Sequence, residues 1–184
     1  GKAPTKKFSK KIGWTFHGNE FIGSKMVKKI FTRLSLPLNE KLKYVQKIVM
    51  MSSRPIIISE DIVTDSAVRR LIYDAGNDID DLLTLCEADI TTKNMKKTLI
   101  YQNNFKIVRQ KIKDVEERDS IRNFQPPITG EIIMAYFNIK PCKEIGLIKE
   151  KIKNAILDGD IRNDYNEAHD LMVKTGKSLG LKDE

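Results

Sequence analysis

The chain has 184 residues, 40% of them hydrophobic and 32% charged, and a formal net charge of +8. This length is enough for one large domain or two small ones, and the composition fits a folded helical protein rather than a disordered one. No apolar run approaches the length that crosses a bilayer, and no apolar stretch follows the lysine-rich start as in a signal peptide.

After about fifteen residues without a clear pattern, residues 21–34 predict the first helix. Its apolar residues are expected on one broad face: Ile22, Met26, Val27, Ile30, Phe31 and Leu34. Asn39 is the expected N-cap of a second helix, which ends at Arg54-Pro55 because proline disfavours helix at the residue before it. Residues 56–58 are three isoleucines and resemble a strand, but three residues do not make a sheet.

Two further helices follow in the acidic part of the chain. Thr64 is expected to cap the third, which ends at Gly76. The fourth covers residues 78–90 and is predicted to face inward with four residues, namely Ile79, Leu82, Leu83 and Cys86.

Residues 94–123 predict one long helix. An apolar seam recurs in it at spacings of four and three, formed by Tyr101, Phe105, Val108, Ile112 and Val115. The fold is therefore predicted to be all-α: a helical bundle over residues 1–123, a smaller helical tail over residues 124–184, and the long helix joining them.

The tail begins with a predicted helical hairpin. Thr129 is the expected N-cap of a helix through Phe137, and Pro141 suits the first position of the next helix, which Gly159 ends. Gly146 lies early in that second helix, where glycine usually marks close approach by another backbone or by a ligand. Residues 165–179 close the chain as a last helix.

Lysines gather around the start of the second tail helix. Exposed N–H groups and the helix dipole at such a start can bind phosphate, and nearby lysines strengthen the attraction. Lys140 and Lys143 flank this start, and Lys149 and Lys153 follow in the same predicted helix. The alternative is a helical hairpin packed only on its own domain, with solvated lysines.

Charge is unevenly distributed. Residues 1–54 carry thirteen Lys/Arg against two Asp/Glu, residues 55–92 two against nine, and residues 93–153 fourteen against seven. Two basic blocks separated by an acidic one favour directed contact with a polyanion over a uniform basic coat. Cys86 and Cys142 belong to no Cys-x-x-Cys or Cys/His cluster, so free thiols in a reducing cytoplasm are expected.

Several segments resemble one family in order along nearly the whole chain. They are GWTFHGNEFIGSKMVKKIFTRLSLPLNEKLKYVQKIV, TDSAVRRLIYDAG, LLTLCEADITTKN and, most specifically, ITGEIIMAYFNIKPCKEIGLIKEKIKNAILDG. These resemble the body and tail of bacterial tRNA nucleotidyltransferases, the CCA-adding enzymes of the poly(A) polymerase superfamily, in the form that carries an HD-type domain.

The resemblance implies that the parent protein adds C, C and A to tRNA 3′ ends. It implies a head that uses Mg²⁺ with CTP and ATP, a neck that selects the nucleotide, and a body and tail that hold tRNA. On this reading the candidate RNA-binding residues are Lys140, Lys143, Lys149 and Lys153. The chain starts at Gly1 without an initiator methionine, so it is expected to be a piece of a longer protein. The resemblance covers body and tail alone, so head and neck are expected to be missing and this piece to be inactive by itself.

The residues agree that the chemistry of the head is missing. Metal-dependent nucleotidyl transfer needs two carboxylates on one face, as Asp-x-Asp provides on a strand. Asp78-Ile79-Asp80-Asp81 instead opens a predicted helix, where residues two apart diverge by about 200°. Gly23-Ser24 lies inside a helical pattern and belongs to no phosphate-binding loop.

An HD-type metal site is the alternative source of activity. His17 and Asp89 match family ligand positions, but Ser52 stands where such relatives place a further histidine. Two remaining ligands do not hold a metal tightly, so no metal is expected here. The alternatives to a tRNA-holding protein are an HD-type metal-dependent phosphohydrolase fragment and a helical protein-interaction module.

Overall fold

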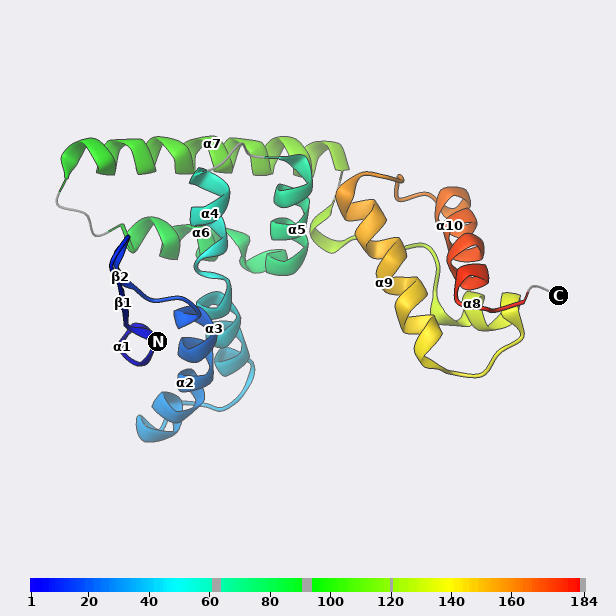
Figure 1. Cartoon of the computed structure of the whole chain (residues 1–184), viewed down its shortest axis with the longest axis horizontal. Helices are drawn as coiled ribbons and strands as arrows, with labels where there is room; N and C mark the ends of the chain where they lie inside the picture. The colour runs from blue at the N-terminus through cyan, green and yellow to red at the C-terminus, as the bar shows by residue number, and fades with distance from the viewer. Residues whose placement is uncertain (61–63, 91–93, 120, 183–184) are drawn as a thin grey trace. The chain divides into compact units, whose positions relative to one another are not determined.

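The computed structural model describes residues 1–60, 64–90, 94–119 and 121–182. This described part is mostly helical and contains one two-stranded sheet, so the all-α prediction is right in its coarse form (Figure 1). The chain divides into two units, residues 1–63 with 71–122 and residues 64–70 with 123–184. The assignment of residues 1–123 and 124–184 to an RNA-binding body and tail stays a prediction.

The first unit starts with short elements and continues with longer helices. In chain order they are α1 (Lys2–Thr5), β1 (Lys7–Ser9), β2 (Gly13–Thr15), α2 (Asn19–Arg33), α3 (Glu40–Met51), α4 (Arg54–Glu60), the end of α5 (Asp65–Ala75), a 3-10 turn (Gly76–Asp78), α6 (Ile79–Ala88) and α7 (Met95–Asp119). The main packing partners are α2 with α3, and α4 with α7.

The core of the first unit confirms two predicted apolar faces. In α6, the four residues expected to face inward are each at most 1% exposed. In α7, the seam is buried from Phe105 to Val115, while Tyr101 is half-buried. The helix ends at Asp119, earlier than predicted; residue 120 lies outside the described residues, and Ile121–Asn123 forms a 3-10 turn.

The predicted broad apolar face of residues 21–34 is wrong in extent. In α2 only Val27 is buried, whereas Met26, Ile30 and Leu34 are exposed. The main neighbour of α2 is α3, and one helix covers a narrower stripe than these residues span. At the contact, the Ser24 hydroxyl donates to the Gln46 carbonyl at 2.9 Å.

The strand-like run at residues 56–58 lies within helix α4, in agreement with the expectation that these three residues do not form a sheet. Pro55 occupies the first turn of this helix, where its missing N–H has no intrahelical partner to lose. Helix α4 packs on α6 and α7. The tertiary context of the helix therefore overrides the local strand preference of this run.

The second unit is a three-helix arrangement around α9. Helices α8 (Gly130–Phe137) and α10 (Tyr165–Ser178) both pack on α9 (Lys143–Asp158). Its buried core includes Ile133, Phe137, Ile148, Ile152 and Met172. No helix in the described ranges is long and apolar enough to cross a membrane.

The helix ends of the second unit follow the predicted capping chemistry, with one shift. The Thr129 hydroxyl accepts a hydrogen bond from the Ile132 N–H at 3.4 Å, and Gly159 ends α9 with φ of 83°. The start of α9 is Lys143, with Cys142 as N-cap, so Pro141 lies before the helix rather than at its first position.

The first residues of α5 belong with the second unit through one side-chain cluster. The Arg70 guanidinium donates to both carboxylate oxygens of Asp158 at 2.8 Å and to the Asn154 side-chain oxygen at 3.1 Å. Such a paired geometry fixes the guanidinium against the last turns of α9. This explains why residues 64–70 group with residues 123–184.

Candidate functional site

Three of the four candidate RNA-binding lysines lie on α9. Lys143, Lys149 and Lys153 follow each other at spacings that place them, with Gly146, along one stripe of the helix. Lys140 lies in the loop between α8 and α9. Lys140, Lys143 and Lys149 are exposed and Lys153 is half-buried. The structure thus places three of these lysines along one side of α9 and the fourth in the loop before it; the four lysines together with Gly146 are called the α9 stripe.

Gly146 is exposed within this α9 stripe. A Cβ atom added there would meet nothing within 4 Å, so the expected close approach by another backbone is wrong. The gap in side chains leaves the helix backbone open to a ligand. Glu150 is exposed and lies four residues after Gly146, which places it next to Gly146 on the helix surface. The stripe is therefore not purely positive.

The net positive charge belongs to the first unit. Its residues carry 22 Lys/Arg against 14 Asp/Glu, whereas the second unit carries 11 against 11. A polyanion is therefore attracted to the first unit as a whole, and to the second unit only through local arrangements such as the α9 stripe.

Helix α2 carries a basic stripe that the sequence reasoning did not single out. It consists of Lys25, Lys28, Lys29 and Arg33, all exposed and spaced along the side of α2 away from Val27. Within the described part of the chain, none of these four residues forms an ion pair with a carboxylate. The excess of thirteen Lys/Arg over two Asp/Glu in residues 1–54 is the signal that could have located it.

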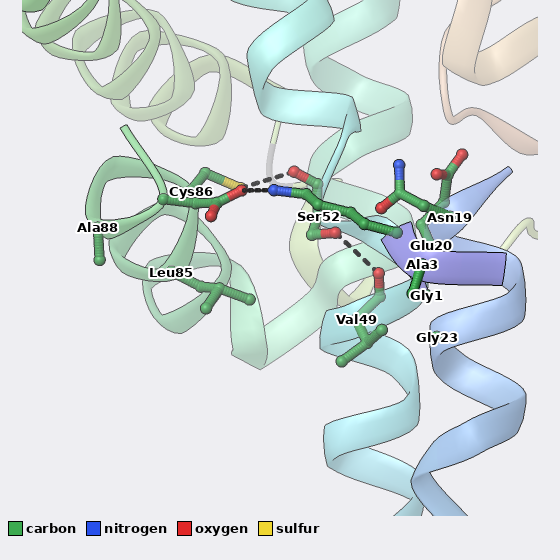
Figure 2. Close-up of a pocket in the computed structure, with 12 residues that line it drawn as sticks. Gly1, Ala3, Asn19, Glu20, Gly23, Val49, Ser52, Leu85, Cys86 and Ala88 are labelled. Carbon is green, nitrogen blue, oxygen red and sulfur yellow. Dashed lines mark hydrogen bonds and ion pairs between the residues drawn. The ribbon is translucent and has the colours of Figure 1, made fainter. Parts of the chain in front are cut away.

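A cavity of about 600 Å³ lies in the first unit between α1, α2, α3 and α6 (Figure 2). Asp89 and Ser52, two of the positions that the HD-type resemblance points to, both line it, together with Asn19, Glu20 and Cys86. The third position, His17, is exposed and is not among the residues that line the cavity. The structure therefore brings together only part of this set.

The residues at the cavity do not fit a metal ion. The Lys2 ammonium lies 3.4 Å from the Asp89 carboxylate, and its positive charge opposes a cation there. Among the residues that the structure describes, no three His, Cys, Asp or Glu side chains are grouped closely enough to hold one.

The acidic run at residues 78–81 has the structural role that the sequence predicts. It opens α6, with Asp80 and Asp81 in the first turn. The Lys47 ammonium donates to the Asp78 carboxylate at 2.7 Å, and the Tyr44 hydroxyl donates to Asp81 at 2.8 Å. That hydrogen bond to a carboxylate raises the pKa of Tyr44. These carboxylates are used in packing α3 on α6.

The two thiols are expected to differ strongly in reactivity. Burial, together with the nearby Asp89 and Glu87 carboxylates, raises the pKa of Cys86 to about 12, whereas Cys142 is exposed. The Cys86 thiol donates to the Ser52 carbonyl at 3.0 Å. At about pH 8 we expect one thiol per chain to react rapidly with a disulfide reagent and the second only after unfolding in urea. Rapid reaction of both in the folded chain would contradict the buried position of Cys86.

The raised pKa of Cys86 also fixes the sign of a pH effect. Its contribution to the free energy of unfolding is complete below the ordinary thiol pKa of 9.0 and is lost as the pH rises to about 12. A Cys86→Ala variant should lack this part of the loss of stability with pH, measured by urea unfolding of both proteins.

Comparison of the chain with models of known families, with curated proteins and with solved structures finds no match. A mostly helical fold hosts many unrelated functions, so it does not identify one by itself. The resemblance to tRNA nucleotidyltransferases therefore stays a prediction.

Proposed function

We propose that this chain holds folded RNA, as the body and tail of a tRNA nucleotidyltransferase hold tRNA. The carrying observation is the α9 stripe, where exposed lysines flank the open backbone at Gly146 beside the start of a helix. The parent protein would add CCA to tRNA 3′ ends, with its bond-making carboxylates, Mg²⁺, CTP and ATP on a head outside these 184 residues.

The chemistry of the α9 stripe suits a phosphate backbone. Lysine ammonium groups on Lys140, Lys143 and Lys149 reach solvent and neutralise phosphate without having to be buried. The positive end of the α9 dipole adds to their attraction, although the Glu144 carboxylate lies in the first turn and accepts hydrogen bonds there. An A-form RNA helix exposes its phosphates and, in its shallow minor groove, its 2′-hydroxyls, whereas side chains cannot reach the base edges in its deep major groove. Recognition of the shape of the RNA is therefore expected.

The test of this proposal is the salt dependence of tRNA binding. We expect the logarithm of the association constant to fall linearly with the logarithm of salt concentration, with a slope of about −3 to −5 if about four to six phosphates are neutralised. Fluorescence anisotropy of labelled tRNA, titrated with the chain at several salt concentrations, measures this slope. A matched unfolded homopolymer RNA separates recognition of folded shape from general attraction.

Absence of tRNA binding at low salt would contradict the proposal. Tightly bound metal in near-stoichiometric amount, with hydrolysis of phosphoesters, would instead support the phosphohydrolase alternative. Retention of a specific protein partner without any response to RNA would support the protein-interaction module.

A further inference from the structure

The β1–β2 hairpin carries two large aromatic side chains on one exposed face. In its antiparallel register Phe8 lies opposite Trp14, and the two rings meet edge to face with centroids 5.2 Å apart. Phe8 is 64% exposed and Trp14 57% exposed. Residues opposite each other across a strand pair share a face, so both rings are presented on the same side.

Exposed aromatic rings of this size are unusual, because an aromatic side chain normally buries most of its area. Ile12, in the connection between the strands, is 76% exposed and adds to the apolar surface. Among the described residues nothing covers this apolar surface of the hairpin. Covering it with a ligand would lower the free energy.

Positive charge lies in and beside the hairpin. Residues 1–16 contain five lysines and no Asp or Glu; Lys2 pairs with Asp89, and the other four are exposed, namely Lys6, Lys7, Lys10 and Lys11. The Lys6 ammonium lies 4.1 Å from the centroid of the Trp14 ring, a cation–π contact that holds a positive charge beside the aromatic face. An anionic partner is favoured over a neutral apolar one.

We propose that this hairpin binds unpaired RNA, with bases stacked on Phe8 and Trp14 and phosphates beside the lysines. Aromatic rings interleaved with lysines are the combination that binds single-stranded nucleic acid, because every base offers a flat face for stacking and every nucleotide a phosphate. Bases inside a duplex do not offer free faces, so the ligand is a single-stranded segment or end.

This inference rests on the proposed function only in the choice of RNA as the ligand. The hairpin and the α9 stripe belong to different units, so each can be altered without touching the other. The two surfaces also differ in ligand: unpaired bases at the hairpin and the backbone of folded RNA at α9.

Trp14 is the only tryptophan of the chain, so its fluorescence reports on the hairpin alone. The experiment titrates the whole chain with an oligoadenylate of about eight nucleotides, within the range of site sizes known for stacking proteins. We expect saturable quenching of Trp14. Phe8→Ala and Phe8→Leu should each weaken binding about tenfold, because both remove one stacking ring.

Phe21→Ala is the matched control. Phe21 is an exposed aromatic residue on α2 with the Lys25 ammonium 3.9 Å from its ring centroid, but no second ring pairs with it among the residues that the structure describes. Its removal should leave quenching unchanged. Lys10→Glu with Lys11→Glu keeps both rings and should weaken binding and lower its salt dependence.

Absence of saturable quenching would overturn the inference. Unchanged affinity of Phe8→Leu for the oligoadenylate would also overturn the inference. Leucine keeps an apolar side chain but offers no ring, so this result would mean that bases do not stack on Phe8. If the oligoadenylate does not quench Trp14 but tRNA binding keeps its steep salt dependence, only the hairpin site is contradicted. If the oligoadenylate quenches Trp14 but folded tRNA does not bind, only the proposed tRNA-holding function is contradicted.

Discussion

Reversal of the four candidate lysines to glutamate, at positions 140, 143, 149 and 153, is expected to lower tRNA affinity by roughly a thousandfold at ~0.1 M salt. Each lysine that neutralises a phosphate releases about one counterion, and its loss makes the salt slope shallower by about one. The variant should therefore bind more weakly and with a flatter salt dependence. Anisotropy titrations of both proteins at matched salt measure the two quantities.

A control with the same change in net charge separates local contact from general attraction. Lys96, Lys97, Lys106 and Lys113 are exposed on α7, and their reversal to glutamate lowers the net charge of the chain by the same amount. We expect this control to lose affinity far less than the α9 variant. Equal losses would mean that the α9 stripe has no special part in binding.

The α2 stripe supplies the competing location for the RNA contact. Reversal of Lys25, Lys28, Lys29 and Arg33 tests it with the same assay and an equal number of charges. If the α2 variant loses affinity and the α9 variant does not, tRNA is held by the first unit and the four predicted lysines are not the contact surface. If both lose affinity, each unit contributes phosphate contacts.

Gly176→Ala is expected to destabilise the second unit by about 2 kcal/mol. Gly176 is buried in α10, and a Cβ atom there would lie 2.2 Å from Cζ of Phe137 and under 3.0 Å from two other atoms of that ring. Phe137 is itself only 4% exposed, so its ring has little room to move. The overlap outweighs the roughly 1 kcal/mol that alanine gains over glycine within a helix.

Gly146→Ala is the matched control, because it makes the same change where nothing lies within 4 Å. This variant should be more stable by about 0.5–1 kcal/mol. Urea unfolding followed by far-UV circular dichroism measures both changes. Phe137→Leu should relieve part of the Gly176→Ala loss, which a double-mutant cycle detects as coupling between the two positions. A stabilised Gly176→Ala variant would show that the ring shifts without cost.

Local chemistry explains which elements could be predicted. Asn39, Thr129 and Gly159 end or begin helices through their own hydrogen bonds or backbone conformation, and these act over a few residues. The buried faces of α6 and α7 were predictable for a similar reason, since their spacing matches the helical repeat. The helix over residues 54–60 was not predicted, because a run of isoleucines favours a strand locally and the tertiary context decides otherwise.

At the candidate site, too, local sequence predicted some features and contacts between distant residues decided the others. The sequence placed Lys143, Lys149 and Lys153 on one helix, and spacing alone aligned them. It did not reveal that His17 lies apart from the cavity that Asp89 lines, or that Asp89 pairs with Lys2. Those facts depend on contacts between residues more than 70 positions apart, which no local pattern encodes.

The order of amino acids by itself determined the helical class, most helix ends and the uneven distribution of charge, since propensity, capping and net charge depend on residues close together in the chain. Only the tertiary structure decided which apolar faces are covered, that Gly146 is open while Gly176 is packed against Phe137, and that Phe8 and Trp14 share an exposed face. The physical reason is that burial is a property of neighbours in space, and two glycines in similar helices differ only through what packs against them.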